Sequence, residues 1–119
     1  MPKKEKTRNN GTMTEAAFWS MLRSHLRRKT TSWKPRNEAI KRASRRYVGE
    51  NKRRKIEVQC AKCEGWFARD QIEVDHIIEA GSLKSFADLP SFVERLFCEV
   101  DGFQVLCKNC HNLKTNKKE

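Results

Sequence analysis

Two pairs of cysteines constrain the fold more than any other feature of this 119-residue chain. Both pairs have the pattern Cys-x-x-Cys, and they comprise Cys60 with Cys63 and Cys107 with Cys110. Two residues between thiolates let both sulfurs face one point at a zinc–sulfur distance of about 2.3 Å, and two such pairs complete a tetrahedral shell. A dithiol redox role would explain one pair but not two. The cysteines therefore predict a structural zinc site.

The composition predicts a small protein that gains stability from such a site. The chain is 37% hydrophobic and 34% charged, and the apolar core of so short a chain is often marginal. No apolar run approaches the roughly 20 residues of a membrane span, and the charged N-terminus lacks the apolar segment of a secretion signal. We therefore expect a cytoplasmic location, no membrane partner, and thiolates that bind metal rather than disulfides. The fifth cysteine, Cys98, is expected to pack in the core.

Positive charge is concentrated in the first half of the chain. The whole chain carries +11, whereas residues 1–55 carry 18 Lys and Arg against 4 Asp and Glu, a net +14, and residues 56–119 carry 8 against 11, a net −3. A basic surface attracts polyanions through counterion release. The charge predicts a nucleic-acid partner, although a solvated basic tail is the alternative. Double-stranded DNA is favoured over RNA because no cluster of exposed aromatic residues offers a stacking platform.

The chain divides into three segments on these grounds. Residues 1–12 are expected to form a disordered basic arm, since they show no apolar periodicity. Residues 13–55 are expected to form a basic helical DNA-binding region, and residues 56–119 a zinc-stabilised module of strands and helices. The predicted fold class is α+β.

Two helices are expected in the basic region. Thr12 and Glu15 have the spacing of a capping box for a helix over roughly 13–28, and Pro35 and Gly49 are placed to begin and end a second helix. The basic residues expected to contact DNA lie on or just after these helices: Arg27, Arg28, Lys41, Arg42, Arg45, Arg46, Arg53 and Arg54.

The second half reads as short strands with two helices. Alternating apolar and polar residues predict strands, and Asp88, Pro90 and Lys108 are suited to helix starts. The expected elements are strands over 56–60, 66–67, 72–78 and 103–106, a short helix after Pro90 and a last helix from Lys108 to about Thr115.

Two histidines and an aspartate near the cysteines offer hydrolytic chemistry. Asp75 and His76 lie between the two cysteine pairs, and His111 follows Cys110 directly. An aspartate oxygen and a neutral imidazole can hold a divalent ion, while a second imidazole can accept a proton from water. Because adjacent strand residues point to opposite faces, Asp75 and His76 share a site only if their strand ends or bends there. By spacing alone, the alternatives are that His76 is a core histidine and that His111 is a zinc ligand beside Cys110.

The order of these motifs resembles the HNH endonuclease family. Cys-x-x-Cys is followed by Val-Asp-His-Ile and then by Leu-Cys-x-x-Cys-His-x-x-Lys-Thr, over roughly residues 56–116. The pattern is similar to small bacteriophage HNH proteins with a four-cysteine zinc site and a ββα-metal fold. The resemblance implies that His76 is the general base, that Asp75 and His111 are ligands of a catalytic Mg²⁺ or Mn²⁺, and that the cysteines bind zinc away from the chemistry.

The resemblance also sets expectations about activity and partners. It implies a metal-dependent DNA endonuclease that nicks one strand per site, acts as a monomer or weak dimer, and works in the host cytoplasm if a phage encodes it. It also implies a role in DNA packaging, with a phage terminase as partner, or alternatively a role in mobility and recombination. Lys114, one turn past His111, is expected to contact the DNA backbone or to stabilise transition-state charge, and a solvated helix lysine is the alternative. The alternative is a noncatalytic zinc-bound DNA-binding module or adaptor that retains the HNH frame.

Two positions depart from the family pattern. Gly102 stands where the family usually has an asparagine, the middle letter of HNH, which commonly orients the general base or its loop. We therefore expect either that backbone groups near Gly102 replace it or that catalysis is weakened. Glu79 stands where the family often has proline, and its carboxylate either faces solvent or joins the metal site.

Overall fold

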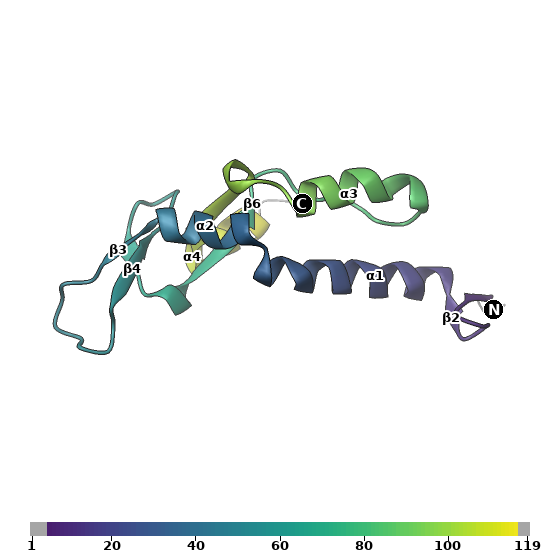
Figure 1. The fold of residues 1–119 in the computed structure, drawn as a ribbon, viewed down its shortest axis with the longest axis horizontal. Helices are drawn as coiled ribbons and strands as arrows, with labels where there is room; N and C mark the ends of the chain where they lie inside the picture. Colours follow the sequence, from purple (N-terminus) through teal and green to yellow (C-terminus); the bar gives the residue numbers. More distant parts are fainter. Residues whose placement is uncertain (1–4, 117–119) are drawn as a thin grey trace.

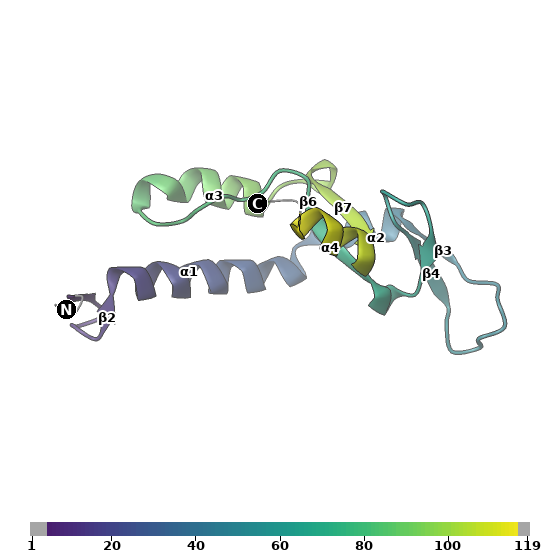
Figure 2. The same cartoon turned by 180° about the vertical axis from the view of Figure 1, so that it is seen from behind.

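Helices and small antiparallel sheets alternate along the chain in the computed structural model, which describes residues 5–116 (Figure 1). The expected α+β class is confirmed. A pair of helices extends from one end of the molecule, while a three-stranded sheet lies at the other end (Figures 1 and 2). None of the helices in the described part of the chain has the length and apolar character needed to span a membrane.

A short hairpin precedes the first helix and corrects the expected disordered arm over residues 1–12. Strand β1 (Lys6–Arg8) pairs antiparallel with β2 (Met13–Thr14). The carboxylate of Glu15 holds the hairpin, because the guanidinium of Arg8 donates hydrogen bonds of 2.9 Å to both of its oxygens. The first four residues of the predicted arm lie outside the described part of the chain.

Helix α1 (Glu15–Lys29) begins at a different cap from the predicted one. The hydroxyl oxygen of Thr14 accepts a hydrogen bond of 3.1 Å from the backbone N–H of Ala17, which satisfies one of the unpaired donors of the first turn. Thr12, the expected cap, instead donates to the carbonyl of Asn9 within the hairpin turn. Thr12 and Glu15, which the local spacing assigned to a helix cap, therefore make hydrogen bonds with residues of the hairpin instead.

Helix α1 packs along α3 (Leu89–Leu96), and the two lie side by side in both views (Figures 1 and 2). Trp19, Phe92 and Leu83 are almost completely buried between them. Burying an apolar side chain of this size stabilises a fold by about 1.5–3 kcal/mol. This packing fixes the C-terminal end of α1 beside the second half of the chain.

Helix α2 (Lys34–Arg42) is shorter than predicted. It was expected to continue to Gly49, but residues after Ala43 form β3 (Ser44–Arg46), which pairs with β4 (Ile56–Gln59). The pairing satisfies backbone groups that a helix would otherwise have used. Arg45 and Arg46 therefore lie on a β-hairpin, not on a helical face.

Two paired strands and the final helix of the second half form as predicted. Strand β6 (Ile72–His76) pairs antiparallel with β7 (Phe103–Cys107), and α4 (Lys108–Asn116) follows directly. The short strand β5 (Trp66–Phe67) completes the sheet β3–β4–β5. This β6–β7–α4 arrangement is consistent with an HNH-type module.

The basic region and the second half share a core. Ile40 of α2 is buried against Val58 of β4, Ile72 of β6 and Val105 of β7. The proposed boundary at residue 56 also passes through the β3–β4 hairpin. The division into a binding region and a nuclease module is therefore a proposal about function, and the two parts pack together.

Candidate metal site and active site

Four cysteine sulfurs lie together at the junction of β4, β7 and α4. The ligand atoms of Cys60, Cys63, Cys107 and Cys110 are all within 4.8 Å of one another. The Cys63 and Cys107 sulfurs are 4.0 Å apart, close to the roughly 3.8 Å that tetrahedral zinc with bonds of about 2.3 Å implies. The cluster can therefore hold zinc, as the cysteine spacing predicted.

Two local turns gather these sulfurs. In the first, the N–H of Cys63 points to the sulfur of Cys60 at 3.5 Å; in the second, the N–H of Cys110 points to the sulfur of Cys107 at 3.4 Å. Burial raises the pKa of the Cys60 thiol, but backbone hydrogen bonds outweigh it and lower this pKa to about 6. Hydrogen bonding with Cys107, followed by burial, raises the pKa of Cys110 to about 12.

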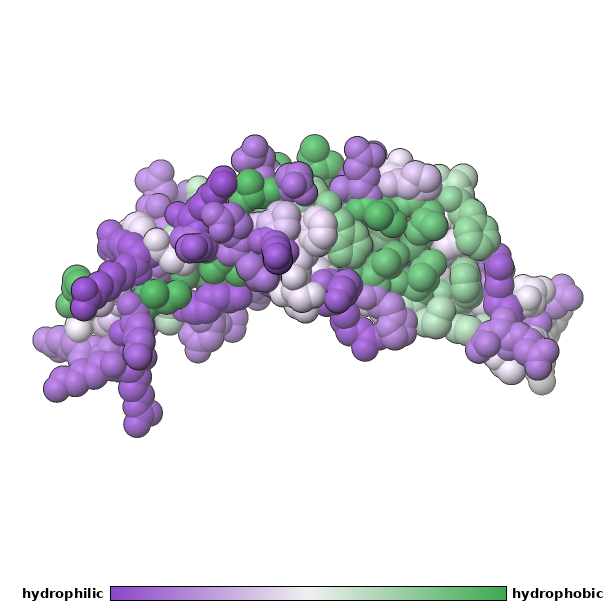
Figure 3. Space-filling view, viewed as in Figure 1, coloured by the Kyte–Doolittle hydropathy of each residue, from purple (hydrophilic) through white to green (hydrophobic). Residues whose placement is uncertain are grey.

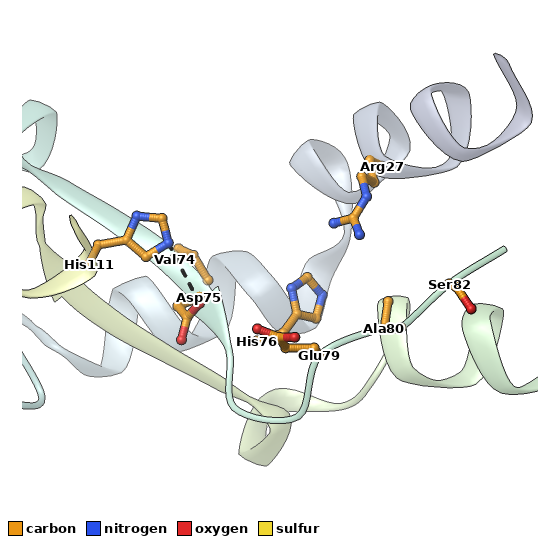
Figure 4. Close-up of a pocket in the computed structure, with 9 residues that line it drawn as sticks. Arg27, Val74, Asp75, His76, Glu79, Ala80, Ser82 and His111 are labelled. Carbon is orange, nitrogen blue, oxygen red and sulfur yellow. Dashed lines mark ion pairs between the residues drawn. The ribbon is translucent and has the colours of Figure 1, made fainter. Parts of the chain in front are cut away.

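A second site lies where β6 ends. Asp75, His76 and His111 line one pocket of about 490 Å³ together with Arg27 from the end of α1 (Figure 4). Strand β6 ends at His76, so the requirement that adjacent residues reach a common site is met. The remaining lining residues come from β6 and the segment that follows it: Val74, Glu79, Ala80, Gly81 and Ser82.

The imidazole of His76 has a fixed orientation. Its Nε2 lies 2.8 Å from the backbone carbonyl oxygen of Leu96. Because a carbonyl only accepts hydrogen bonds, Nε2 carries a hydrogen, and in the neutral ring the free lone pair is on Nδ1. The ring packs against Phe103, yet it also lines the pocket, in which Figure 4 shows it pointing toward Arg27.

Backbone groups hold the loop after His76 at the position of the missing asparagine. The N–H of Ile77 donates to the carbonyl of Gly102 at 2.9 Å. A Cβ atom at residue 102 would lie 2.5 Å from the sulfur of Cys98, so an asparagine does not fit without movement. Trp33 further fixes this segment, because its indole N–H donates to the Cys98 carbonyl at 2.7 Å.

The two carboxylate oxygens of Asp75 make different contacts. Its Oδ2 accepts a hydrogen bond of 2.9 Å from Gln104 and forms an ion pair with Lys114. Burial raises the pKa of Asp75, but the bonds from Gln104 and Lys114 outweigh it and lower this pKa below its usual value. Its Oδ1 faces Nε2 of His111 at 3.6 Å (Figure 4).

The gap between Asp75 and His111 fits a divalent cation. Mg²⁺ binds oxygen ligands at about 2.0–2.1 Å, so one ion can contact two ligand atoms that are 3.6 Å apart. The ring of His111 contacts carboxylates rather than the sulfur cluster, since its Nδ1 lies 2.7 Å from Oε2 of Glu73. This placement disfavours the alternative in which His111 binds zinc.

Several groups that hold the site residues in place were not predicted in these roles. Lys114 forms an ion pair with Asp75, and its Nζ lies 3.2 Å from the carbonyl oxygen of His76. The Leu96 carbonyl carries no sequence signal, because any residue supplies a backbone oxygen. Glu73 could have been found, since residues 73 and 75 alternate on one face of a strand.

The other predicted DNA-binding residues lie on separate surfaces. Arg28 contacts His25 on α1, and Arg42 pairs with Glu38 on α2. Hydrophilic residues gather at the end of the molecule that carries the β3–β4 hairpin, while apolar residues gather over α1 and α3 (Figure 3). The predicted residues on that hairpin or its connecting loop are Arg45, Arg46, Arg53 and Arg54, and exposed Lys41 lies on α2.

Known proteins provide one relevant likeness. Over 65 residues, the chain is 34% identical to a probable HNH endonuclease of Lactococcus phage SK1. The matched part is 55% of this chain and 62% of the relative, so the chain spans about three fifths of the length of the curated relative that it matches. No family model matches the chain, and no solved structure matches it.

The relative and the geometry agree with the motif pattern. The relative is a probable HNH endonuclease from a phage, and the four cysteines form a cluster compatible with zinc beside a strand–strand–helix unit. The resemblance to the HNH endonuclease family is thus confirmed: over 55% of its length, the chain is similar to a probable HNH endonuclease from a phage.

Proposed function

We propose that this chain is a metal-dependent DNA endonuclease that nicks one strand of double-stranded DNA at each encounter. One observation carries the proposal: His76, Asp75, His111 and Arg27 line a single pocket. The relationship to a probable HNH endonuclease supports nuclease activity at the level of the family.

His76 is the proposed general base. Its Nδ1 accepts a proton from the attacking water, while the Leu96 carbonyl holds the ring through Nε2 and stabilises the imidazolium that forms. A positioned general base typically contributes about 10²–10⁴-fold to the rate.

Asp75 and His111 would hold Mg²⁺ or Mn²⁺ through Oδ1 and Nε2, the two atoms that face each other. Such an ion neutralises charge on the phosphate and on the leaving oxygen. Arg27 lines the opposite side of the same pocket. Its planar guanidinium suits two hydrogen bonds to phosphate oxygens, so we assign it to the scissile phosphate.

The basic surfaces are proposed to hold the rest of the DNA. The β3–β4 hairpin presents arginines away from the pocket, and a two-stranded ribbon has the dimensions to enter a major groove. One pocket with one general base acts on one phosphate, which favours a nick and a monomer. Association with a phage terminase, a role in packaging and the host cytoplasm as location remain predictions that rest on the family resemblance.

A supercoiled-plasmid assay tests this function. The zinc-loaded chain should produce open circles in the presence of Mg²⁺ or Mn²⁺, and His76→Ala should reduce the rate by at least about 10²-fold. His25→Ala is a matched control, because His25 lies on α1 and contacts Arg28 outside the pocket.

The assay also separates the two functional classes. Zinc content and salt-sensitive DNA binding should persist in His76→Ala. Equal cleavage by wild type and His76→Ala would overturn the assignment of the base. DNA binding by the wild type without any cation-dependent nicking would favour a noncatalytic DNA-binding module.

A further inference from the structure

Glu73 contacts the ring of His111 at the nitrogen that does not face Asp75. The carboxylate oxygen Oε2 lies 2.7 Å from Nδ1, within hydrogen-bonding distance. Glu73 and Asp75 are two residues apart on β6, so both side chains project toward α4, which carries His111. The imidazole therefore lies between two carboxylates that contact its two different nitrogens.

The short contact determines where the ring hydrogen lies. A carboxylate only accepts hydrogen bonds, so Nδ1 of His111 carries a hydrogen. In the neutral ring, Nε2 then has the free lone pair, and Nε2 is the atom that faces Oδ1 of Asp75. The 3.6 Å between these atoms exceeds a normal hydrogen bond but suits two ligands of one ion.

We propose that Glu73 is a positioning residue that fixes the tautomer and orientation of His111 so that its Nε2 binds the divalent cation with Asp75. The proposal rests on the proposed function and adds a residue to it. A carboxylate that accepts the second N–H of a ligating histidine typically changes metal affinity by 10–100-fold when it is removed.

A purely structural role for Glu73 would predict a change in stability in Glu73→Ala and no specific loss of cation affinity. The side chain of Glu73 is 42% exposed, and exposed ion pairs contribute little to stability. Glu73→Ala should therefore leave the melting temperature and zinc content close to wild type. Under the proposal, its cation affinity falls even though the fold is retained.

The experiment measures Mn²⁺ affinity on the zinc-loaded full chain, by electron paramagnetic resonance of free Mn²⁺. Glu73→Ala should weaken binding by about 10–100-fold. The Mn²⁺ affinity of Glu73→Gln should lie between those of the wild type and Glu73→Ala, because the amide oxygen still accepts a hydrogen bond from Nδ1–H. Glu57→Ala is the matched control: Glu57 is also a strand glutamate in an ion pair, with Arg45 at 2.6 Å, and it should bind Mn²⁺ like the wild type.

A second measurement needs no variant. At pH 8, where an ordinary imidazole is neutral, ¹⁵N NMR of the cation-free wild type should show hydrogen on Nδ1 of His111. Hydrogen on Nε2 would overturn the proposal. Unchanged Mn²⁺ affinity in Glu73→Ala would overturn it as well.

His111→Ala distinguishes failure of this inference from failure of the proposed function. If His111→Ala loses Mn²⁺ binding while Glu73→Ala keeps it, the role of Glu73 is wrong and the metal site stands. If His111→Ala binds Mn²⁺ like the wild type, the proposed site itself is wrong, and the role of Glu73 is overturned with it.

Discussion

The sulfur cluster borders the strand–strand–helix unit that carries the Asp75–His111 pair, yet the two sites are built differently. In the cluster, four ligand atoms of one kind converge within 4.8 Å, and local turns supply them. In the pair, each ligand is also held by a neighbour: Asp75 by Lys114 and Gln104, and His111 by Glu73.

This difference is the one expected between a metal site that supports folding and the proposed site of the chemistry. Four thiolates leave no position open around zinc, so the ion closes the chain and its binding energy contributes to folding. The Asp75–His111 pair supplies only two ligands, and its charges are already compensated by the chain. We therefore expect removal of zinc to unfold this unit and removal of the second cation to leave it folded.

The largest predicted effect comes from Cys60→Ser. Loss of one thiolate should abolish stoichiometric zinc binding and remove the cooperative unfolding transition, since structural zinc supplies of the order of 10 kcal/mol in small domains. Zinc analysis and circular dichroism measure both. Cys98→Ser is the control, because Cys98 lies outside the cluster; retained zinc in Cys60→Ser would contradict the ligand set.

Gly102→Ala should disturb the second site and spare the first. The new Cβ would meet the sulfur of Cys98 at 2.5 Å, and overpacking of this kind costs about 1–3 kcal/mol. Urea denaturation measures the loss, and zinc content should stay at one ion per chain. Adding Cys98→Ala should recover part of the stability; no recovery would show that the contact with sulfur is not the cause.

Lys114→Met should change stability and cation affinity in opposite directions. Loss of the ion pair with Asp75 should destabilise the cation-free protein by about 1 kcal/mol, because the pair is partly exposed. Removing a positive charge beside the ligands should tighten Mn²⁺ binding by about tenfold, given the Coulomb energies at this range. Calorimetric titration tests this, and weaker binding would indicate that Lys114 mainly orients the carboxylate.

The same variant should change the acid response. The folded-state pKa of Asp75 is lowered, so its contribution to stability is present above the unfolded-state pKa of about 3.9 and is lost as pH falls through the folded value. Lys114→Met raises the folded pKa toward the unfolded value, so less stability should be lost on acidification and the loss should end at a higher pH. Thermal melts between pH 2 and 6 would measure this.

The smallest effect should come from the hairpin that precedes α1. Hydrogen bonds from Arg8, then from Trp19, lower the pKa of Glu15 to about 2. Its contribution is therefore present above the ordinary glutamate pKa and is lost as pH falls toward 2. Glu15→Gln should lower Tm slightly at neutral pH, and not near pH 2, with both metal sites unaffected. A change in zinc or Mn²⁺ affinity would contradict this independence.

Patterns confined to a few residues gave the correct predictions. The cysteine pairs, the last two strands and the final helix depend on spacing within one turn or one strand. Helix α2 was predicted too long, because Tyr47 continues an apolar stripe that a local pattern assigns to a helix. The pairing of β3 with β4 depends on residues ten or more positions away, and no local sequence periodicity indicates it.

The sequence by itself singled out the four cysteines of the sulfur cluster and predicted Asp75, His76 and His111 as site residues, because these predictions depend on residue type and short spacing. Only the tertiary structure decided which atoms of those residues are free. The Leu96 carbonyl leaves Nδ1 of His76 open, and Glu73 leaves Nε2 of His111 open. Both contacts join residues 20 or more positions apart. In the first contact, the partner is also a backbone carbonyl, which every residue carries.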